Sequence, residues 1–271
     1  MVQDLCALAE RAGVETMRFY QSCTSVTLKC DSSPLTDADR ASHDFLMQSL
    51  PALMADIPII SEESVDPSND LGKVTDRFWL VDPLDGTKEF LKGSGEFTVN
   101  IALIERGRPL VGVIHAPVRG LTYFADSSNG AFRQRRGEMP VAIRVQQAKR
   151  ERLRVVASKD HAGPLVAAML SRLGDVELKS MGSSLKFCLV AEGSADVYLR
   201  DVPTMEWDTA AAQCIVEAAG GTLLTLDGQP LRYGKPDLKN PPLITIGDPD
   251  LPWPALLGQG DGLHLRARWR D

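Results

Sequence analysis

One segment constrains this chain more than any other. Residues 79–87 read Trp-Leu-Val-Asp-Pro-Leu-Asp-Gly-Thr. The apolar run predicts a buried strand that delivers Asp82 at its end, and Pro83 is expected to stop the strand pairing and set a turn. Asp85 follows three residues later, Gly86 allows a tight backbone, and Thr87 is expected to begin a helix. Two carboxylates this close in the chain repel each other unless a cation lies between them.

A cation here would be held by oxygen. Mg²⁺ prefers carboxylates, carbonyls and water, and it usually keeps part of its coordination sphere for a substrate phosphate. The amides of Gly86 and Thr87, at a helix start, would donate to such an anion. The four histidines are scattered and the five cysteines lack a CxxC spacing, so no His- or Cys-rich site is expected. The alternative for an isolated segment of this kind is a turn with Asp caps.

Other carboxylates occupy comparable places. Glu62 and Glu63 come after the apolar residues 57–60 and Ser61, where an acidic pair is costly unless it is solvated or bound to metal. Asp208 stands at the head of a helical run, where plain N-capping is the simpler reading. Asp39 reads by itself as a carboxylate in the first turn of a helix. Each of these residues is ambiguous when taken singly.

Composition limits the partners and the location. The net charge is 30 − 36 = −6, which argues against a nucleic-acid polymer as a partner. No apolar run is long enough to span a membrane, and no secretory signal is expected, because Met1-Val2-Gln3-Asp4 lacks a basic region followed by an apolar stretch. Reduced thiols in the cytoplasm are expected. A peripheral position on the cytoplasmic face of the inner membrane is left open, with residues 266–270 as a basic, solvated tail.

Periodicity and turn signals predict alternating helices and strands. The length of 271 residues suits one large domain or two modest ones, and a boundary is expected near residue 148. Helices are expected over 2–22, 38–53 (with Thr36 or Asp37 as N-cap), 163–173, 184–192 and 208–219. Strands are expected over 26–28, 57–60, 78–81, 97–106, 109–116, 121–125, 153–157 and 195–199.

Three motifs, residues 61–63, 81–87 and 207–211, together resemble the inositol monophosphatase superfamily of Mg²⁺-dependent, lithium-sensitive phosphatases. The resemblance runs in order from about Lys29 to Gly221. It implies an α/β (α+β) fold, a layered αβαβα sandwich. An N-terminal α+β domain, 1–148, would carry most metal ligands. A C-terminal α/β domain, 149–271, would carry Asp208 and the nucleotide contacts, so the site is expected where the two halves meet.

Finer features are similar to the bacterial 3'(2'),5'-bisphosphate nucleotidase branch. They are residues 31–39, 88–90, 182–188 and 203–208. Inositol monophosphatases usually have Thr-Asn-Phe where this chain has Lys88, Glu89 and Phe90. Enzymes of the nucleotidase branch remove the 3'-phosphate of 3'-phosphoadenosine 5'-phosphate, release AMP, and serve sulfur assimilation.

The resemblance also implies roles for individual residues. Two or three Mg²⁺ ions would be held by Glu62, Asp82, the carbonyl of Leu84, Asp85 and Asp208, with Asp82 bridging two of them and Glu63 taking no part. Asp39 and Thr87 would orient and deprotonate the metal-activated water that attacks in line. The phosphate would be held by the amides of Gly86 and Thr87.

Nucleotide contacts follow from the same resemblance. Ser183, Lys186 and Arg200 match positions that contact the phosphates and ribose, and His161 matches one that packs near the adenine. Lys186 and Arg200 suit a second phosphate, which an inositol monophosphate lacks. The chain departs from the pattern twice: Asp160 stands where a second serine is usual, and Ala212 where glycine is common. The first departure concerns base contacts and the second only helix packing.

The leading hypothesis is a Mg²⁺-dependent phosphatase acting on 3'-phosphoadenosine 5'-phosphate, with its 5'-phosphosulfate analogue left open. The alternative within the enzyme class is an inositol monophosphatase or a related small-molecule phosphomonoesterase. A catalytically silent nucleotide sensor or scaffold is disfavoured, because all five ligand positions together with Asp39 and Thr87 are chemically intact. The sequence leaves open whether the chain forms a homodimer.

Overall fold

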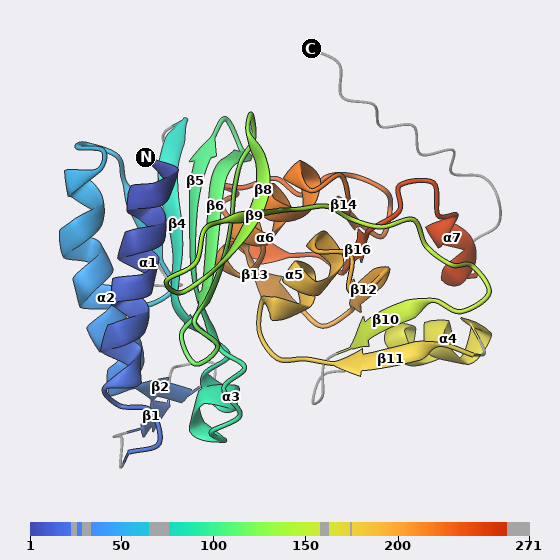
Figure 1. Cartoon of the computed structure of the whole chain (residues 1–271), viewed down its shortest axis with the longest axis horizontal. Helices are drawn as coiled ribbons and strands as arrows, with labels where there is room; N and C mark the ends of the chain where they lie inside the picture. The colour runs from blue at the N-terminus through green and yellow to red at the C-terminus, as the bar shows by residue number, and fades with distance from the viewer. Residues whose placement is uncertain (23–25, 29–33, 65–75, 158–162, 174, 259–271) are drawn as a thin grey trace.

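Apolar runs in the first half of the chain pair into a seven-stranded sheet, in the order β3-β4-β5-β6-β7-β8-β9 (Figure 1). The structure is a computed structural model that describes residues 1–22, 26–28, 34–64, 76–157, 163–173 and 175–258. The strands are β3 Ile59–Ser61, β4 Arg77–Asp85, β5 Thr98–Glu105, β6 Arg108–Ala116, β7 Leu121–Asp126, β8 Gly130–Arg135 and β9 Val141–Ile143. β3 runs parallel to β4, and the later pairs are antiparallel.

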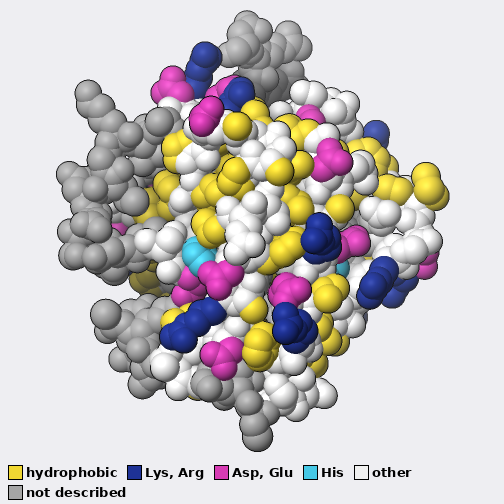
Figure 2. All heavy atoms as spheres, turned by 90° about the vertical axis from the view of Figure 1, so that its left-hand side faces the viewer, with side chains coloured by type: hydrophobic (Ala, Val, Ile, Leu, Met, Phe, Trp, Pro, Cys, Tyr) yellow, Lys and Arg dark blue, Asp and Glu magenta, His cyan; other side chains and the backbone are white. Residues whose placement is uncertain are grey.

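Helices α1 (Val2–Met17) and α2 (Asp37–Ser49) cover one face of this sheet (Figure 1). Apolar residues at helical spacing give each helix a buried stripe, which packs on Trp79 and Ile101 of the sheet. Figure 2 shows this side of the molecule, where acidic and basic side chains are interspersed with apolar ones. The described side chains of this face therefore do not gather into a broad surface of a single charge.

Helices α5 (Leu185–Ala191) and α6 (Glu206–Ala218) cover the opposite face of the same sheet. They also contact a second sheet, so that one apolar cluster joins Leu80 and Ile114 to Ile215 of α6 and to Tyr198 and Leu243 of the second sheet. α6 is buried along most of its length, which fits its position between two sheets.

The second sheet has the order β11-β10-β12-β16-β14. Its strands are β10 Arg154–Ala157, β11 Glu177–Ser180, β12 Val197–Arg200, β14 Thr222–Thr225 and β16 Leu243–Ile246. Helices α4 (Pro164–Leu173) and α7 (Trp253–Leu256) pack on its other face. The predicted αβαβα layering is confirmed. The short elements are β1 Val26–Leu28, β2 Pro34–Thr36, η1 Leu50–Ala52, α3 Thr87–Leu91, β13 Thr204–Met205 and β15 Lys239–Asn240.

Several predicted boundaries are wrong. The first helix ends at Met17, and the second gives way to a 3-10 turn at Leu50, next to a proline that cannot continue the hydrogen bonding. α6 begins two residues before Asp208. Strands β8 and β11 were not predicted, because polar residues fill most of their positions and hide the period-2 pattern. The three-residue strand β9 is too short to show a pattern, and β14 and β16 of the second sheet were also not predicted. The boundary near residue 148 stays a prediction.

Some expectations concern residues outside the described ranges. They are His161 and its neighbour Asp160, residues 31–33 of the first branch motif, Cys23 and Cys30, and the basic tail 266–270. The three described cysteines are free and buried, as expected for small core residues. Among the described residues, no helix has the length and apolar character needed to cross a membrane.

Close packing of α6 on the first sheet depends on Gly112 of β6. A methyl group added there would lie 2.5 Å from the carbonyl oxygen of Ala211 and 2.9 Å from its Cα atom. We expect Gly112→Ala to lower the free energy of unfolding by about 1–3 kcal/mol, because backbone must move to make room. Urea denaturation measures this change. Gly247→Ala is the control, since its methyl would meet no atom closer than 3.5 Å; an equal loss there would contradict the packing argument.

Candidate metal centre and anion pocket

Strand β4 continues through Pro83 and carries one acidic side chain before this proline and one after it. Asp82 pairs with Asn100 and Asp85 pairs with Thr98, so three steps along β4 match two along β5. This irregularity is a bulge, and the missing N–H of Pro83 is tolerated there. The prediction that Pro83 stops the strand pairing is therefore wrong. In a regular strand, residues three apart point to opposite faces; the bulge lets Asp82 and Asp85 approach the same point.

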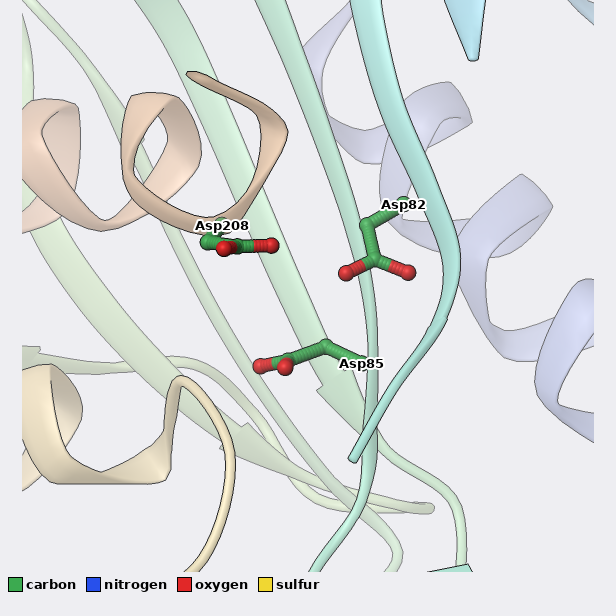
Figure 3. Close-up of side chains that lie close together, drawn as sticks. All are labelled: Asp82, Asp85 and Asp208. Atoms are coloured by element: carbon green, nitrogen blue, oxygen red, sulfur yellow. The ribbon is translucent and has the colours of Figure 1, made fainter. Parts of the chain in front are cut away.

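Asp208 reaches the same point from the other half of the chain. It is the third residue of α6, and one of its carboxylate oxygens accepts a hydrogen bond from the N–H of Met205 (2.8 Å). One oxygen each of Asp82, Asp85 and Asp208 lie within 4.8 Å of one another (Figure 3). An all-carboxylate donor set at this spacing is suited to a hard divalent cation such as Mg²⁺.

The pKa of Asp208 reflects both its burial and the negative charges around it. Burial, followed by the charges of Asp85 and Glu62, raises the pKa of Asp208 to about 8. A carboxylate that resists ionisation in this way is stabilised when a cation joins the cluster. The donor chemistry of the site therefore fits a bound metal ion.

We expect metal binding to this cluster to release protons. Below a pH of about 8, Asp208 keeps its proton in the metal-free protein, and a cation must displace that proton to bind. Affinity for Mg²⁺ should therefore fall as the pH is lowered from 8 to 6, by up to about tenfold per pH unit for one proton. Calorimetry in two buffers of different ionisation enthalpy counts the protons. Proton uptake on binding, or affinity that is constant across this range, would contradict the expectation.

Glu62 lies at the same edge of the sheet. It follows β3, which runs parallel to β4, and its N–H donates to the carbonyl of Val81 (3.1 Å). Its charge contributes to the raised pKa of Asp208, which places it close to the cluster, although it is outside the group of three carboxylates within 4.8 Å.

Asp39 and Thr87 meet as the resemblance implies. Asp39 is buried in the first turn of α2, where its Oδ2 accepts from the N–H of Thr36 (2.7 Å). Its Oδ1 accepts from the hydroxyl of Thr87 (3.3 Å), which also lies 3.5 Å from the carbonyl oxygen of Leu84. Thr36 is the predicted N-cap, and its capping box sets the direction of Asp39. The catalytic role of the pair stays a prediction.

A cavity of about 260 Å³ adjoins the carboxylates. Its lining includes five of the residues predicted to bind substrate: Gly86, Thr87, Ser183, Lys186 and Arg200. It also includes Lys88 and Glu89, which were named above only as a feature of the branch, and residues that were not predicted individually: Pro34, Ser184, Phe187, Tyr198 and Thr204. Tyr198 could have been inferred, because it lies two residues before Arg200 on β12 and so shares its face.

Lys186 brings a buried positive charge to this cavity. Its side chain is 5 % exposed, its Nζ donates to the carbonyl of Ser183 (2.6 Å), and it lies 5.5 Å from the ring centre of Tyr198. Burial lowers its pKa to about 8, with Asp85 opposing this shift and Arg200 adding to it. A buried ammonium beside a second cation creates an anion-binding site.

Comparisons with known proteins agree with this geometry. The sequence model of the inositol monophosphatase family matches residues 2–246. The chain is 44% identical over 235 residues to the 3'(2'),5'-bisphosphate nucleotidase CysQ of Escherichia coli O157:H7, covering 86% of this chain and 94% of that protein.

Solved structures share the fold. The crystal structure of CysQ from Bacteroides thetaiotaomicron, a bacterial member of the inositol monophosphatase family, superposes with a TM-score of 0.76 at 40% identity, covering 89% of this chain and 94% of that one. The extragenic suppressor protein suhB from Bartonella henselae superposes with a TM-score of 0.79 at 26% identity, covering 94% of this chain and 97% of that one.

Proposed function

Because this chain belongs to the inositol monophosphatase family, we propose that it is a metal-dependent phosphatase that removes the 3'-phosphate of 3'-phosphoadenosine 5'-phosphate and releases AMP. The observation that carries this proposal is the pairing of two unlike sites in one cavity. The carboxylates of Asp85 and Asp208, which belong to the cluster, line the same cavity as the buried ammonium of Lys186 and the guanidinium of Arg200. Relatives named 3'(2'),5'-bisphosphate nucleotidase CysQ support it.

The carboxylate side would hold the cation. Its ligands would be Glu62, Asp82, the carbonyl of Leu84, Asp85 and Asp208. Mg²⁺ bound there would neutralise the charge that develops on the attacking and leaving oxygens of an in-line displacement. Two or three such ions belong to the proposal, and so does inhibition by lithium through occupation of one Mg²⁺ position.

Asp39 and Thr87 would act on the attacking water. The hydroxyl of Thr87 donates to Oδ1 of Asp39, so its oxygen remains available to accept a hydrogen bond from the water. A proton given to Thr87 could then be passed along the existing hydrogen bond to Asp39. Because the other oxygen of Asp39 is held by Thr36, the accepting oxygen has a defined direction. The amides of Gly86 and Thr87 would hold the 3'-phosphate.

The cationic side would hold the 5'-phosphate. Lys186 and Arg200 would present two positive charges, and Ser183, which also lines the cavity, would add a hydroxyl. The role of His161 beside the adenine remains part of the proposal. A place in sulfur assimilation, which the resemblance to the nucleotidase branch implies, and a cytoplasmic location, which the reduced thiols predict, complete the proposal.

A substrate panel in Mg²⁺ tests the proposal. Phosphate release is measured from 3'-phosphoadenosine 5'-phosphate, its 5'-phosphosulfate analogue and inositol 1-phosphate. We expect kcat/KM for the first to exceed that for inositol 1-phosphate by about 100-fold, since only the nucleotide uses the cationic wall. A better rate with inositol 1-phosphate would overturn the substrate assignment. Nucleotide binding in EDTA without hydrolysis in Mg²⁺ would point instead to a silent sensor.

A further inference from the structure

Behind Asp85 lies a chain of buried polar side chains to which the proposed function gives no role. Thr98, Asn100 and Ser184 are each at most 1 % exposed. The hydroxyl of Thr98 donates to Oδ1 of Asn100 (2.9 Å), and Nδ2 of Asn100 donates to Oγ of Ser184 (2.9 Å). Oγ of Ser184 in turn lies 2.8 Å from Oδ2 of Asp85. Buried polar groups of this kind are costly unless every member is satisfied.

The hydrogen bonds of this chain run in one direction. Thr98 donates to the amide oxygen of Asn100, so the amide nitrogen of Asn100 faces Ser184. The hydroxyl of Ser184 accepts from that nitrogen, and its single proton is left for an acceptor on the far side. Oδ2 of Asp85 is the closer and the charged acceptor, and the carbonyl of Asp208 is the alternative at 3.1 Å.

One carboxylate oxygen of Asp85 is therefore held by hydrogen bonds from the protein itself. Oδ2 accepts from the hydroxyl of Ser184 and from its backbone N–H (2.6 Å), and the hydroxyl of Thr98 lies at 3.4 Å. A carboxylate held by donors on one oxygen cannot rotate freely, so its other oxygen is the one presented to a cation.

The same contacts join the elements that carry the carboxylates. Asn100 lies on β5, Ser184 precedes α5, and Asp85 ends β4. Ser184 also approaches the carbonyl of Asp208 in the first turn of α6. The serine therefore connects the carboxylate from the first half of the chain to the helix that brings in the carboxylate from the second half.

The backbone next to Ser184 has an unfavourable conformation that hydrogen bonds to the first half of the chain hold in place. Ser183 has φ = 48°, a left-handed conformation that is unfavourable for a residue with a side chain. Carboxylates of the first half hold both sides of it, because Glu96 accepts from the N–H of Gly182 (2.8 Å) and Asp85 accepts from that of Ser184.

We propose that Asn100 and Ser184 are positioning residues for the metal centre. They orient the Asp85 carboxylate so that one defined oxygen faces the cation, and they tie that carboxylate to the start of α6. The inference rests on the proposed function, since it presupposes that a cation binds at Asp82, Asp85 and Asp208.

The test measures metal affinity of the full chain without substrate. Calorimetric titration with Mn²⁺ and with Mg²⁺ is compared for the wild type and for Ser184→Ala. We expect the dissociation constant to rise by about tenfold or more, the usual effect of removing a partner that orients a ligand. Thr16→Val is the control, since it also removes a buried hydroxyl, one that donates to the carbonyl of Gly13 in α1. Its metal affinity should equal that of the wild type.

A double-mutant cycle tests the connection between the two residues. Asn100→Ala should weaken metal binding by itself, and adding it to Ser184→Ala should cost little more, because Asn100 acts on Asp85 through Ser184. Additive effects would overturn the relay. If Ser184→Ala does not fold, Thr98→Val provides the second variant, because it removes the first hydroxyl at nearly constant volume; we expect a loss of roughly threefold in affinity.

Two results separate failure of this inference from failure of the metal centre. Wild-type affinity in Ser184→Ala, together with lost binding in Asp82→Asn, would overturn the positioning role alone. Wild-type affinity in both variants would overturn the inference together with the metal centre on which it rests.

Discussion

Asp82→Asn is expected to lower turnover of 3'-phosphoadenosine 5'-phosphate by about a thousandfold or more while leaving the fold intact. The change removes one negative charge from three carboxylates that lie within 4.8 Å of one another, so cations bind weakly and phosphate is no longer attracted. Asparagine has the same shape as aspartate and keeps an oxygen for the N–H of Leu84, which now donates to Oδ1 of Asp82 (3.0 Å). Stability without metal should therefore be equal or higher.

Turnover at saturating Mg²⁺, together with the melting temperature with and without EDTA, measures this prediction. Glu63→Gln is the matched control, because it removes a neighbouring negative charge from a residue to which no ligand role is assigned. Its turnover should stay within about threefold of the wild type, as is usual for a charge outside the reacting groups. Near-normal turnover in Asp82→Asn would refute the metal assignment.

Lys186→Met should lower kcat/KM for 3'-phosphoadenosine 5'-phosphate by about 100-fold and affect 3'-AMP far less. The buried ammonium lines the same cavity as Asp85 and Asp208, and a charge-assisted contact with phosphate is worth about 2–3 kcal/mol. 3'-AMP has no 5'-phosphate and does not use this contact. Methionine fills a similar volume without a charge, but it removes the donor to the carbonyl of Ser183, so the melting temperature of the variant is measured as well.

Steady-state kinetics with both nucleotides measures the selectivity. Lys88→Met is the control, since Lys88 also lines the cavity but is exposed, and an exposed charge contributes little. We expect less than about a threefold change there. Equal losses with both nucleotides in Lys186→Met would mean that the lysine supports the cavity rather than the 5'-phosphate.

The αβαβα layering was implied by the family resemblance, whereas several elements of the first half were predictable from local patterns. Apolar runs of the right length predicted β4, β5 and β6, and Thr36 marked the start of α2. The bulge at Pro83 was not predictable from β4, because it exists only in the pairing with β5, where Thr98 meets Asp85. A proline in a strand predicts an interruption, and only the partner strand decides whether the interruption ends the strand or bends it.

In the candidate site, too, some features were predictable from the sequence and others were not. The sequence showed the chemical kind of each group, because a carboxylate that follows an apolar strand or opens a helix is a local feature. It could not show which oxygen of Asp85 is occupied, since Ser184 lies 99 positions away in the chain. It also could not show that Lys186 is buried with a lowered pKa.

The sequence by itself therefore determined which chemical groups are available to the predicted site: carboxylates for a cation, the side chains of Asp39 and Thr87, and the positive charges of Lys186 and Arg200. Only the tertiary structure decided its geometry. The carboxylates of Asp82 and Asp208 meet because α6 packs closely on the first sheet at Gly112. Asp85 is oriented by Asn100 and Ser184. Distances and desolvation between segments far apart in the chain depend on how the layers pack, and no local pattern encodes them.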